Sequence, residues 1–162
     1  MKVDDGRVFV DLVHETSECF GNWSPNQSVK VGDYGVLNRK TAEFEKEGSI
    51  YDADFRPELQ IGKNHPVLEG ATEGQYIIVS RGCSAEAFDA DFSEKHPEIV
   101  DSTIKGRWRI TGKKGAIVVL IKPKEFRIQD KGKLLPHLSL FLKRKCLVTS
   151  IFTCPMFALC EF

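Results

Sequence analysis

The clearest pattern in the chain is a two-residue alternation of apolar and charged positions over residues 103–111. The core positions in this pattern are Ile104, Trp108 and Ile110, and the solvent positions are Lys105, Arg107 and Arg109. A period of two predicts a half-buried strand with one apolar and one cationic face. Residues 84–92 also alternate, with one apolar and one acidic side, and predict a second strand of this kind.

Apolar runs rich in β-branched residues and bounded by turn residues predict further strands. Together with the alternating segment, the predicted strands cover residues 8–13, 75–80, 103–111, 116–121 and 147–152. We expect them to pair mainly antiparallel, with a hairpin-like meander between residues 29 and 51.

Two stretches depart from this period. Residues 134–142 place leucines at i, i+4 spacing, which predicts a short helix with one leucine face and Pro136 in its first turn. Residues 52–74 are rich in proline, glycine and acidic residues and predict a long connection with one short helical turn. The predicted fold class is therefore α+β and β-rich: a mainly antiparallel twisted sheet with long connections and one or two short helices.

The length of 162 residues and the hydrophobic content of 41% fit a single domain over residues 1–162. The chain ends inside an apolar stretch at Glu161 and Phe162, which favours a C-terminally truncated fragment of a larger domain. No run of 18 apolar residues and no signal peptide can be recognised, so we expect a cytoplasmic protein.

Residue types that carry chemistry do not form known motifs. The five cysteines have no framework spacing and predict free thiols. The four histidines lie far apart, and neither zinc nor calcium spacing occurs, so we expect no metal site and no cofactor. Residues 80–84 follow a predicted buried strand but lack the glycines of a nucleophile elbow. We therefore assign no catalytic residue and expect that the protein is not an enzyme.

A net charge of zero conceals a strong asymmetry along the chain. Residues 1–100 hold 10 Lys/Arg and 19 Asp/Glu, a net charge of −9, whereas residues 101–162 hold 13 and 4, a net charge of +9. A basic region can bind acidic lipid headgroups or nucleic-acid phosphates, and the alternative is that the two halves neutralise each other. The candidate anion-binding residues are Lys105, Arg107, Arg109, Lys113 and Lys114.

The order of elements in the last third resembles the end of the pore-forming domain of microbial (fungal and bacterial) gasdermins. The resemblance lies in a basic strand pair at 105–109 and 116–124, a leucine-spaced segment at 126–142 and a strand at 147–151. The hairpin at 31–35 is compatible with the early sheet of the family. The resemblance implies a protein peripheral to membranes that binds acidic lipids, oligomerises and opens a β-barrel pore in cell death.

Two other classes of function stay open. A small β-rich ligand- or protein-binding module would use the loop around Trp23 together with Tyr34. A nucleic-acid binder would use Trp108 and the cations beside it, because single-stranded nucleic acid stacks on aromatic rings within basic grooves. We rank nucleic acid as a less favoured partner than acidic membrane lipids.

Overall fold

The structure of the protein is a computed structural model, and it describes residues 5–21, 28–38, 40–41, 43–72, 74–96, 99–112 and 114–161. Strands dominate these residues, and every strand pair within them is antiparallel. Short helices complete the described chain. The prediction of an α+β, β-rich fold with antiparallel sheets is confirmed.

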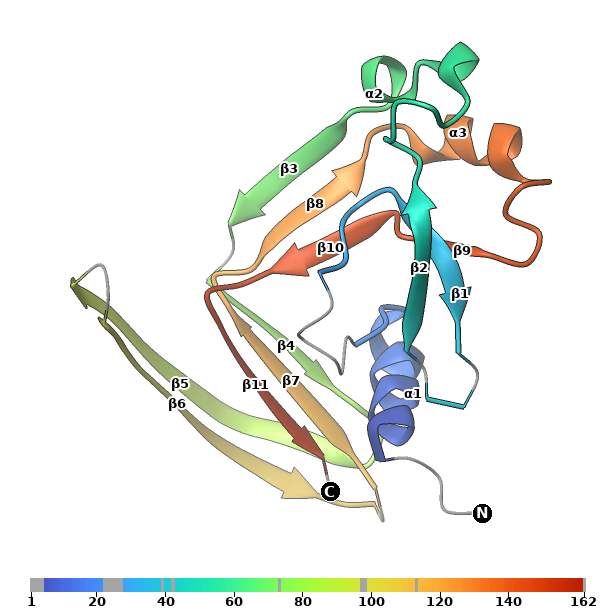
Figure 1. The fold of residues 1–162 in the computed structure, drawn as a ribbon. Helices are drawn as coiled ribbons and strands as arrows, with labels where there is room; N and C mark the ends of the chain where they lie inside the picture. The colour runs from blue at the N-terminus through green and yellow to red at the C-terminus, as the bar shows by residue number, and fades with distance from the viewer. Residues whose placement is uncertain are drawn as a thin grey trace. The chain divides into compact units, whose positions relative to one another are not determined.

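The chain, drawn as a ribbon in Figure 1, divides into two compact units. Each unit has its own buried apolar cluster. Unit 1 comprises Met1–Gly21, Glu73–Pro123 and Cys154–Phe162, and unit 2 comprises Asn22–Thr72 and Lys124–Thr153. Both units are therefore assembled from segments that lie far apart in the sequence.

Unit 1 contains a three-stranded sheet with the strand order β11-β7-β4. Its strands are β4 (Gln75–Val79), β7 (Ala116–Ile121) and β11 (Met156–Glu161). Strands β4 and β7 confirm two of the predicted strands. β7 lies in the middle, and Ile117, Val119 and Ile121 form the buried cluster of this unit.

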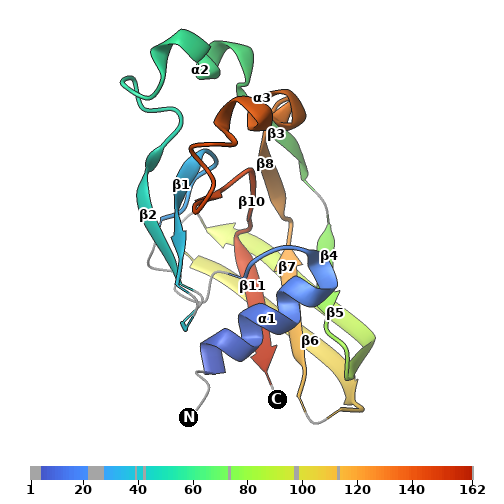
Figure 2. The same ribbon diagram turned by 90° about the vertical axis from the view of Figure 1, so that its right-hand side faces the viewer.

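The predicted strand at residues 8–13 is wrong, because this segment belongs to helix α1 (Asp5–Ser17). The helix contacts β4 and β7 and lies across their sheet (Figure 2). Phe9, Val10 and Val13 are buried, and their spacing places them on one side of the helix. Burial of this side outweighs the strand preference of β-branched residues, which is weak and depends on context.

The remaining strands of unit 1, β5 (Cys83–His96) and β6 (Ile99–Ile110), pair only with each other in the described chain. We call this two-stranded hairpin the ribbon. β5 contains the whole of the predicted strand at 84–92. β6 contains the predicted strand at 103–111 except for residue 111. The base of β5 contacts β4 and β7, and the two strands extend from there as a long, curved pair (Figure 1).

Unit 2 contains two three-stranded sheets, with the strand orders β2-β1-β9 and β10-β8-β3. The strands are β1 (Asp33–Leu37), β2 (Phe44–Ser49), β3 (Val67–Thr72), β8 (Lys124–Ile128), β9 (Cys146–Leu147) and β10 (Ser150–Thr153). The helices are η1 (Pro57–Leu59), α2 (Ile61–Asn64) and α3 (Lys131–Leu138). The core residues are Val31, Ile50, Ile61, Ile128, Leu134 and Leu138. β1 and β2 form a hairpin within the expected meander. The hairpin predicted at 31–35 is wrong, because residues 33–37 form the single strand β1.

The predicted strand at residues 147–152 occurs as two pieces. β9 pairs with β1, whereas β10 pairs with β8 in the other sheet. Between them, the Val148 N–H donates to the Asp33 carbonyl at 2.8 Å, and the Val148 carbonyl accepts from the Gly32 N–H at 2.8 Å. The chain thus changes sheets while these backbone groups stay paired.

The predicted helix at 134–142 starts one turn earlier than expected. α3 begins at Lys131, so Pro136 lies inside the helix and not in its first turn. The start is set at Asp130, which has a φ of 52° and whose carbonyl accepts the Lys133 N–H at 2.8 Å. Leu134 and Leu138 are buried, so the predicted leucine face is confirmed.

The connection predicted at residues 52–74 contains the short helices η1 and α2, as expected, but also strand β3, which was not predicted. β3 has no sustained alternation, and its register against β8 shifts between Glu69 and Thr72. Its extended conformation depends on pairing with a strand more than fifty residues away, which no local pattern indicates.

Candidate functional site

The ribbon carries most of the residues that we predicted to bind anions. Its ladder pairs Phe88 with Gly106 and Asp89 with Lys105, and its register shifts at Glu86. Residues that pair directly in an antiparallel ladder share a face. The pairing therefore places Phe88, Ala90, Ile104 and Gly106 on one face of the ribbon, and Asp89 and Lys105 on the other. A shift of one residue is a β-bulge, which bends the bulged strand.

The cations of β6 that the structure describes are exposed, as predicted. Nη2 of Arg109 lies 3.1 Å from Oε1 of Glu86, and 71% of the Arg109 side chain remains exposed. Arg107 is exposed as well. An ion pair this exposed contributes about 1 kcal/mol at most, so Arg109 can exchange Glu86 for another anion at small cost. Lys114 is exposed, whereas Lys113 and the Lys105 side chain lie outside the described residues.

The prediction that Trp108 points into the core is wrong. The residue has 36% of its surface exposed and lies in sequence between two exposed arginines. Strand side chains stand roughly perpendicular to their sheet, so an element packed on the face of the ribbon is needed to bury Trp108. The contacts of the ribbon with β4 and β7 are made through β5. A period of two shows which positions share a face, but it does not show whether that face meets a core. The side chains of Ile104 and Ile110 lie outside the described residues.

The alternative site at Trp23 and Tyr34 is described only in part, because Trp23 lies outside the described residues. The Tyr34 ring packs against two other rings, with centroid distances of 4.8 Å to Phe141 and 5.5 Å to Phe55. Nζ of Lys145 lies 5.4 Å from the Tyr34 centroid. The ring is therefore occupied by contacts within unit 2.

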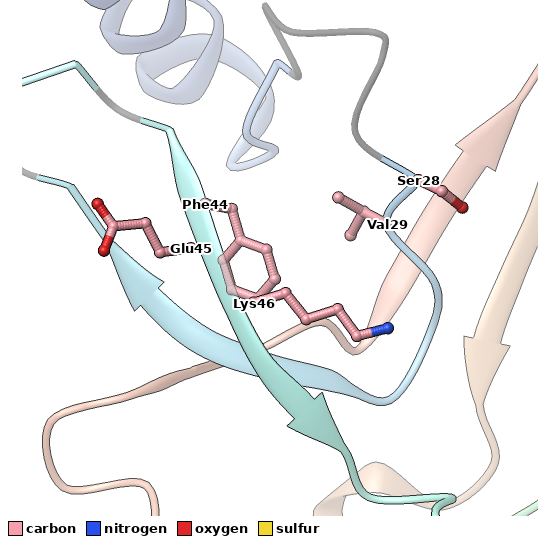
Figure 3. A pocket seen from close by; sticks show the side chains of 5 residues that line it. All are labelled: Ser28, Val29, Phe44, Glu45 and Lys46. Atoms are coloured by element: carbon pink, nitrogen blue, oxygen red, sulfur yellow. The ribbon is translucent and has the colours of Figure 1, made fainter.

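An open hollow of about 220 Å³ adjoins strand β2 (Figure 3). It is lined by Ser28, Val29, Phe44, Glu45 and Lys46. The ammonium of Lys46 lies 2.9 Å from Oδ1 of Asp33, a side chain that is 1% exposed. Pockets for small ligands usually measure about 300 Å³ or more, and here the cation is already paired. The hollow therefore gives little support to a small-molecule site.

The buried polar side chains of the described chain have partners that explain their burial. Oδ2 of Asp33 accepts the Lys30 N–H at 2.8 Å, and Oγ of Ser80 accepts the Ala116 N–H at 2.7 Å. Both groups therefore stabilise the backbone of their unit. Among the residues that the structure describes, no three His, Cys, Asp or Glu side chains lie close enough together to hold a metal ion.

The thiols follow the prediction where the structure describes them. Cys19, Cys83, Cys146 and Cys154 are free, and the Cys160 side chain lies outside the described residues. Burial raises the pKa of the Cys154 thiol, so this group stays protonated at neutral pH. Because the thiolate is the reactive form, burial makes Cys154 a poor nucleophile.

Comparison with protein-family models, curated proteins and solved structures gives no match for this chain. The described helices are all too short or too polar to cross a membrane. The exposed aromatic and cationic side chains of the ribbon are thus the main physical basis for a functional proposal.

Proposed function

We propose that the protein is a cytoplasmic, gasdermin-like protein that binds acidic membrane surfaces through the ribbon. The observation that carries this proposal is an exposed tryptophan, Trp108, on one face of β6, with the exposed Arg107 and Arg109 on its other face. An indole ring prefers the boundary between headgroups and hydrocarbon, because its body is apolar and its N–H is polar. A guanidinium donates paired hydrogen bonds to phosphate, which lies at the same boundary.

The charge of the C-terminal third supports this function. Residues 101–162 carry a net charge of +9, and each cation near an acidic leaflet contributes about 1 kcal/mol to binding. Arg109 has only an exposed partner, Glu86, and a lipid phosphate can replace that partner. Arg109 therefore keeps a favourable electrostatic interaction when the ribbon lies at an acidic membrane surface.

The length of the ribbon supports the further step of oligomerisation into a pore. β5 has 14 residues and β6 has 12, whereas a tilted strand needs about 9–11 residues to cross the hydrocarbon layer. Phe88 pairs with Gly106 and Ala90 with Ile104, which over this part of the ribbon is the pattern required for one face in lipid. Nearer the tip, Phe92 pairs with Ser102 and Glu94 with Val100. We propose that ribbons of several copies associate edge to edge at the membrane.

Liposome flotation with a pair of matched variants tests the lipid-binding step. Arg107→Ser with Arg109→Ser removes two exposed cations from the ribbon, and Arg81→Ser with Lys122→Ser removes two exposed cations elsewhere in unit 1. We expect roughly tenfold weaker binding to acidic liposomes for the ribbon variant and less than threefold for the control. An equal loss in both variants would show that only net charge matters and would contradict the proposed site.

Dye release and nucleic-acid retardation separate the remaining functions. Release of dye from acidic liposomes by the wild-type protein supports a pore, and binding without release limits the function to lipid attachment. Retardation of a single-stranded oligonucleotide at physiological salt, without flotation, favours nucleic acid instead. A wild-type protein that neither floats with acidic liposomes nor retards the oligonucleotide contradicts the membrane proposal and favours the β-rich binding module.

A further inference from the structure

A second basic segment lies in unit 2, over α3 and the turn that follows it. Residues 131–146 contain five Lys/Arg and no Asp/Glu. The five cations are Lys131, Lys133, Lys143, Arg144 and Lys145. Lys133 pairs with Asp130, and Lys145 pairs with Glu47. Lys143 and Arg144 are exposed and have no ion-pair partner among the described residues.

Leu140, in the same turn, has 88% of its surface exposed. A single exposed leucine is ordinary on a soluble protein, so its exposure carries no meaning alone. Here, however, backbone hydrogen bonds shape the turn around it. The Leu142 N–H donates to the Leu138 carbonyl at 2.9 Å, and the Lys145 N–H donates to the Leu142 carbonyl at 3.0 Å.

Side-chain packing fixes the same turn. Phe141 meets the rings of Tyr34 and Phe55 edge to face, with centroid distances of 4.8 and 5.1 Å. Nζ of Lys145 lies 4.9 Å from the Phe141 centroid, within the range of a cation–π contact. Because Phe141 packs on the rings of unit 2, the neighbouring Leu140 is held in an exposed position. The same turn carries the exposed Lys143 and Arg144.

We propose that Leu140, Lys143 and Arg144 form a second contact with acidic bilayers, separate from the ribbon. The two cations bind lipid phosphates, and the leucine side chain enters the boundary between headgroups and acyl chains. Residues 131–146 contain no acidic residue, so this segment is complementary in charge to an acidic surface. The exposed leucine can be buried in a lipid layer, whereas a sugar-phosphate backbone offers it no apolar contact. The inference shares the lipid class of the proposed function but uses no residue of the ribbon.

Two single-tryptophan proteins distinguish the two surfaces, because the chain has only two tryptophans. Trp23→Phe leaves Trp108 as the reporter of the ribbon. Trp23→Phe with Trp108→Phe and Leu140→Trp places the reporter in the turn. With acidic vesicles, we expect the emission of the turn reporter to shift to the blue and to be quenched by brominated lipid. The matched control carries Glu58→Trp, an exposed position of unit 2, in place of Leu140→Trp and should show neither change.

The outcomes separate this inference from the proposed function. A response at position 140 without one at Trp108 supports the turn and contradicts the ribbon. A response at Trp108 alone contradicts the turn and leaves the ribbon standing. No response at either position contradicts both, and an equal response at position 58 overturns the assignment to the turn.

A charge variant provides the second measurement. Lys143→Ser with Arg144→Ser should weaken binding to acidic vesicles roughly tenfold, while Lys40→Ser with Lys63→Ser, two exposed cations of the same unit, should weaken it less than threefold. Equal losses, or unchanged binding of the first variant, overturn the inference. A single-stranded oligonucleotide that shifts the turn reporter as strongly as vesicles do would assign the surface to nucleic acid instead.

Discussion

At the scale of single residues, Gly32 has a restricted backbone position in unit 2. Its φ is +90°, and an added Cβ would lie 2.3 Å from Cδ2 of Tyr51. The left-handed backbone and the ring contact both disfavour a side chain. We expect Gly32→Ala to lower the free energy of unfolding by about 1–3 kcal/mol in urea denaturation. Gly62→Ala, whose Cβ meets open space in α2, should be neutral or slightly stabilising. Equal losses would contradict this assignment.

Tyr51 provides a residue-scale prediction that depends on pH. Its hydroxyl donates to the His65 carbonyl at 2.8 Å, and burial raises its pKa above the usual 10.0. A raised pKa in the folded state means that this stabilisation is complete below pH 10 and is lost as the pH rises further. We expect Tyr51→Phe to cost about 1 kcal/mol at neutral pH and the difference from wild type to shrink above the usual tyrosine pKa. Parallel stability curves from neutral to alkaline pH would be inconsistent with this role.

At the scale of elements, helix α1 depends on its contact with the sheet of unit 1. Phe9 is fully buried in that contact. We expect Phe9→Ala to lower the free energy of unfolding by about 3–5 kcal/mol, because it removes a large buried ring and leaves a cavity. Glu15→Ala, on the exposed side of the same helix, should change it by less than about 0.5 kcal/mol. Chemical denaturation compares the two, and similar effects would show that α1 does not pack as described.

The elements also differ in how far the sequence could predict them. β7 is a continuous apolar run that is buried along nearly its whole length, so composition alone predicts a strand. The valines at 8–13 are equally β-branched, yet α1 is a helix because the helical spacing of Phe9, Val10 and Val13 fits the sheet beneath it. β3 lacks any alternation and acquires its conformation from β8.

At the scale of the whole molecule, the charge asymmetry leads to a prediction about salt. The screening length of about 10 Å at 0.1 M salt shortens to about 3 Å at 1 M, so exposed cations lose attraction to acidic headgroups. We expect flotation with acidic liposomes to weaken several-fold between low and high salt. The variant with Arg107→Ser and Arg109→Ser should show a shallower dependence on salt than wild type. Salt-independent flotation would contradict an electrostatic membrane contact.

At the candidate site, the sequence predicted the exposure of the charged side chains correctly but not the exposure of the tryptophan. The alternation over 103–111 correctly predicted that Arg107 and Arg109 are exposed. It placed Trp108 in a core, because an apolar face normally lies against other elements, but the contacts of the ribbon with β4 and β7 are made through β5. The anchored turn at Leu140 was missed entirely. Its anchor joins Tyr34, Phe55 and Phe141, which local patterns do not connect.

The sequence by itself determined the β-rich fold class, the strands of the central apolar runs, the leucine face of α3 and the uneven distribution of charge. These features depend on period and composition within a few residues, where side-chain geometry repeats regularly. Only the tertiary structure decided that residues 8–13 form a helix, that Trp108 is exposed and that Leu140 projects from a fixed turn. Each of these depends on which surface lies opposite a residue, and that surface is supplied by residues far along the chain.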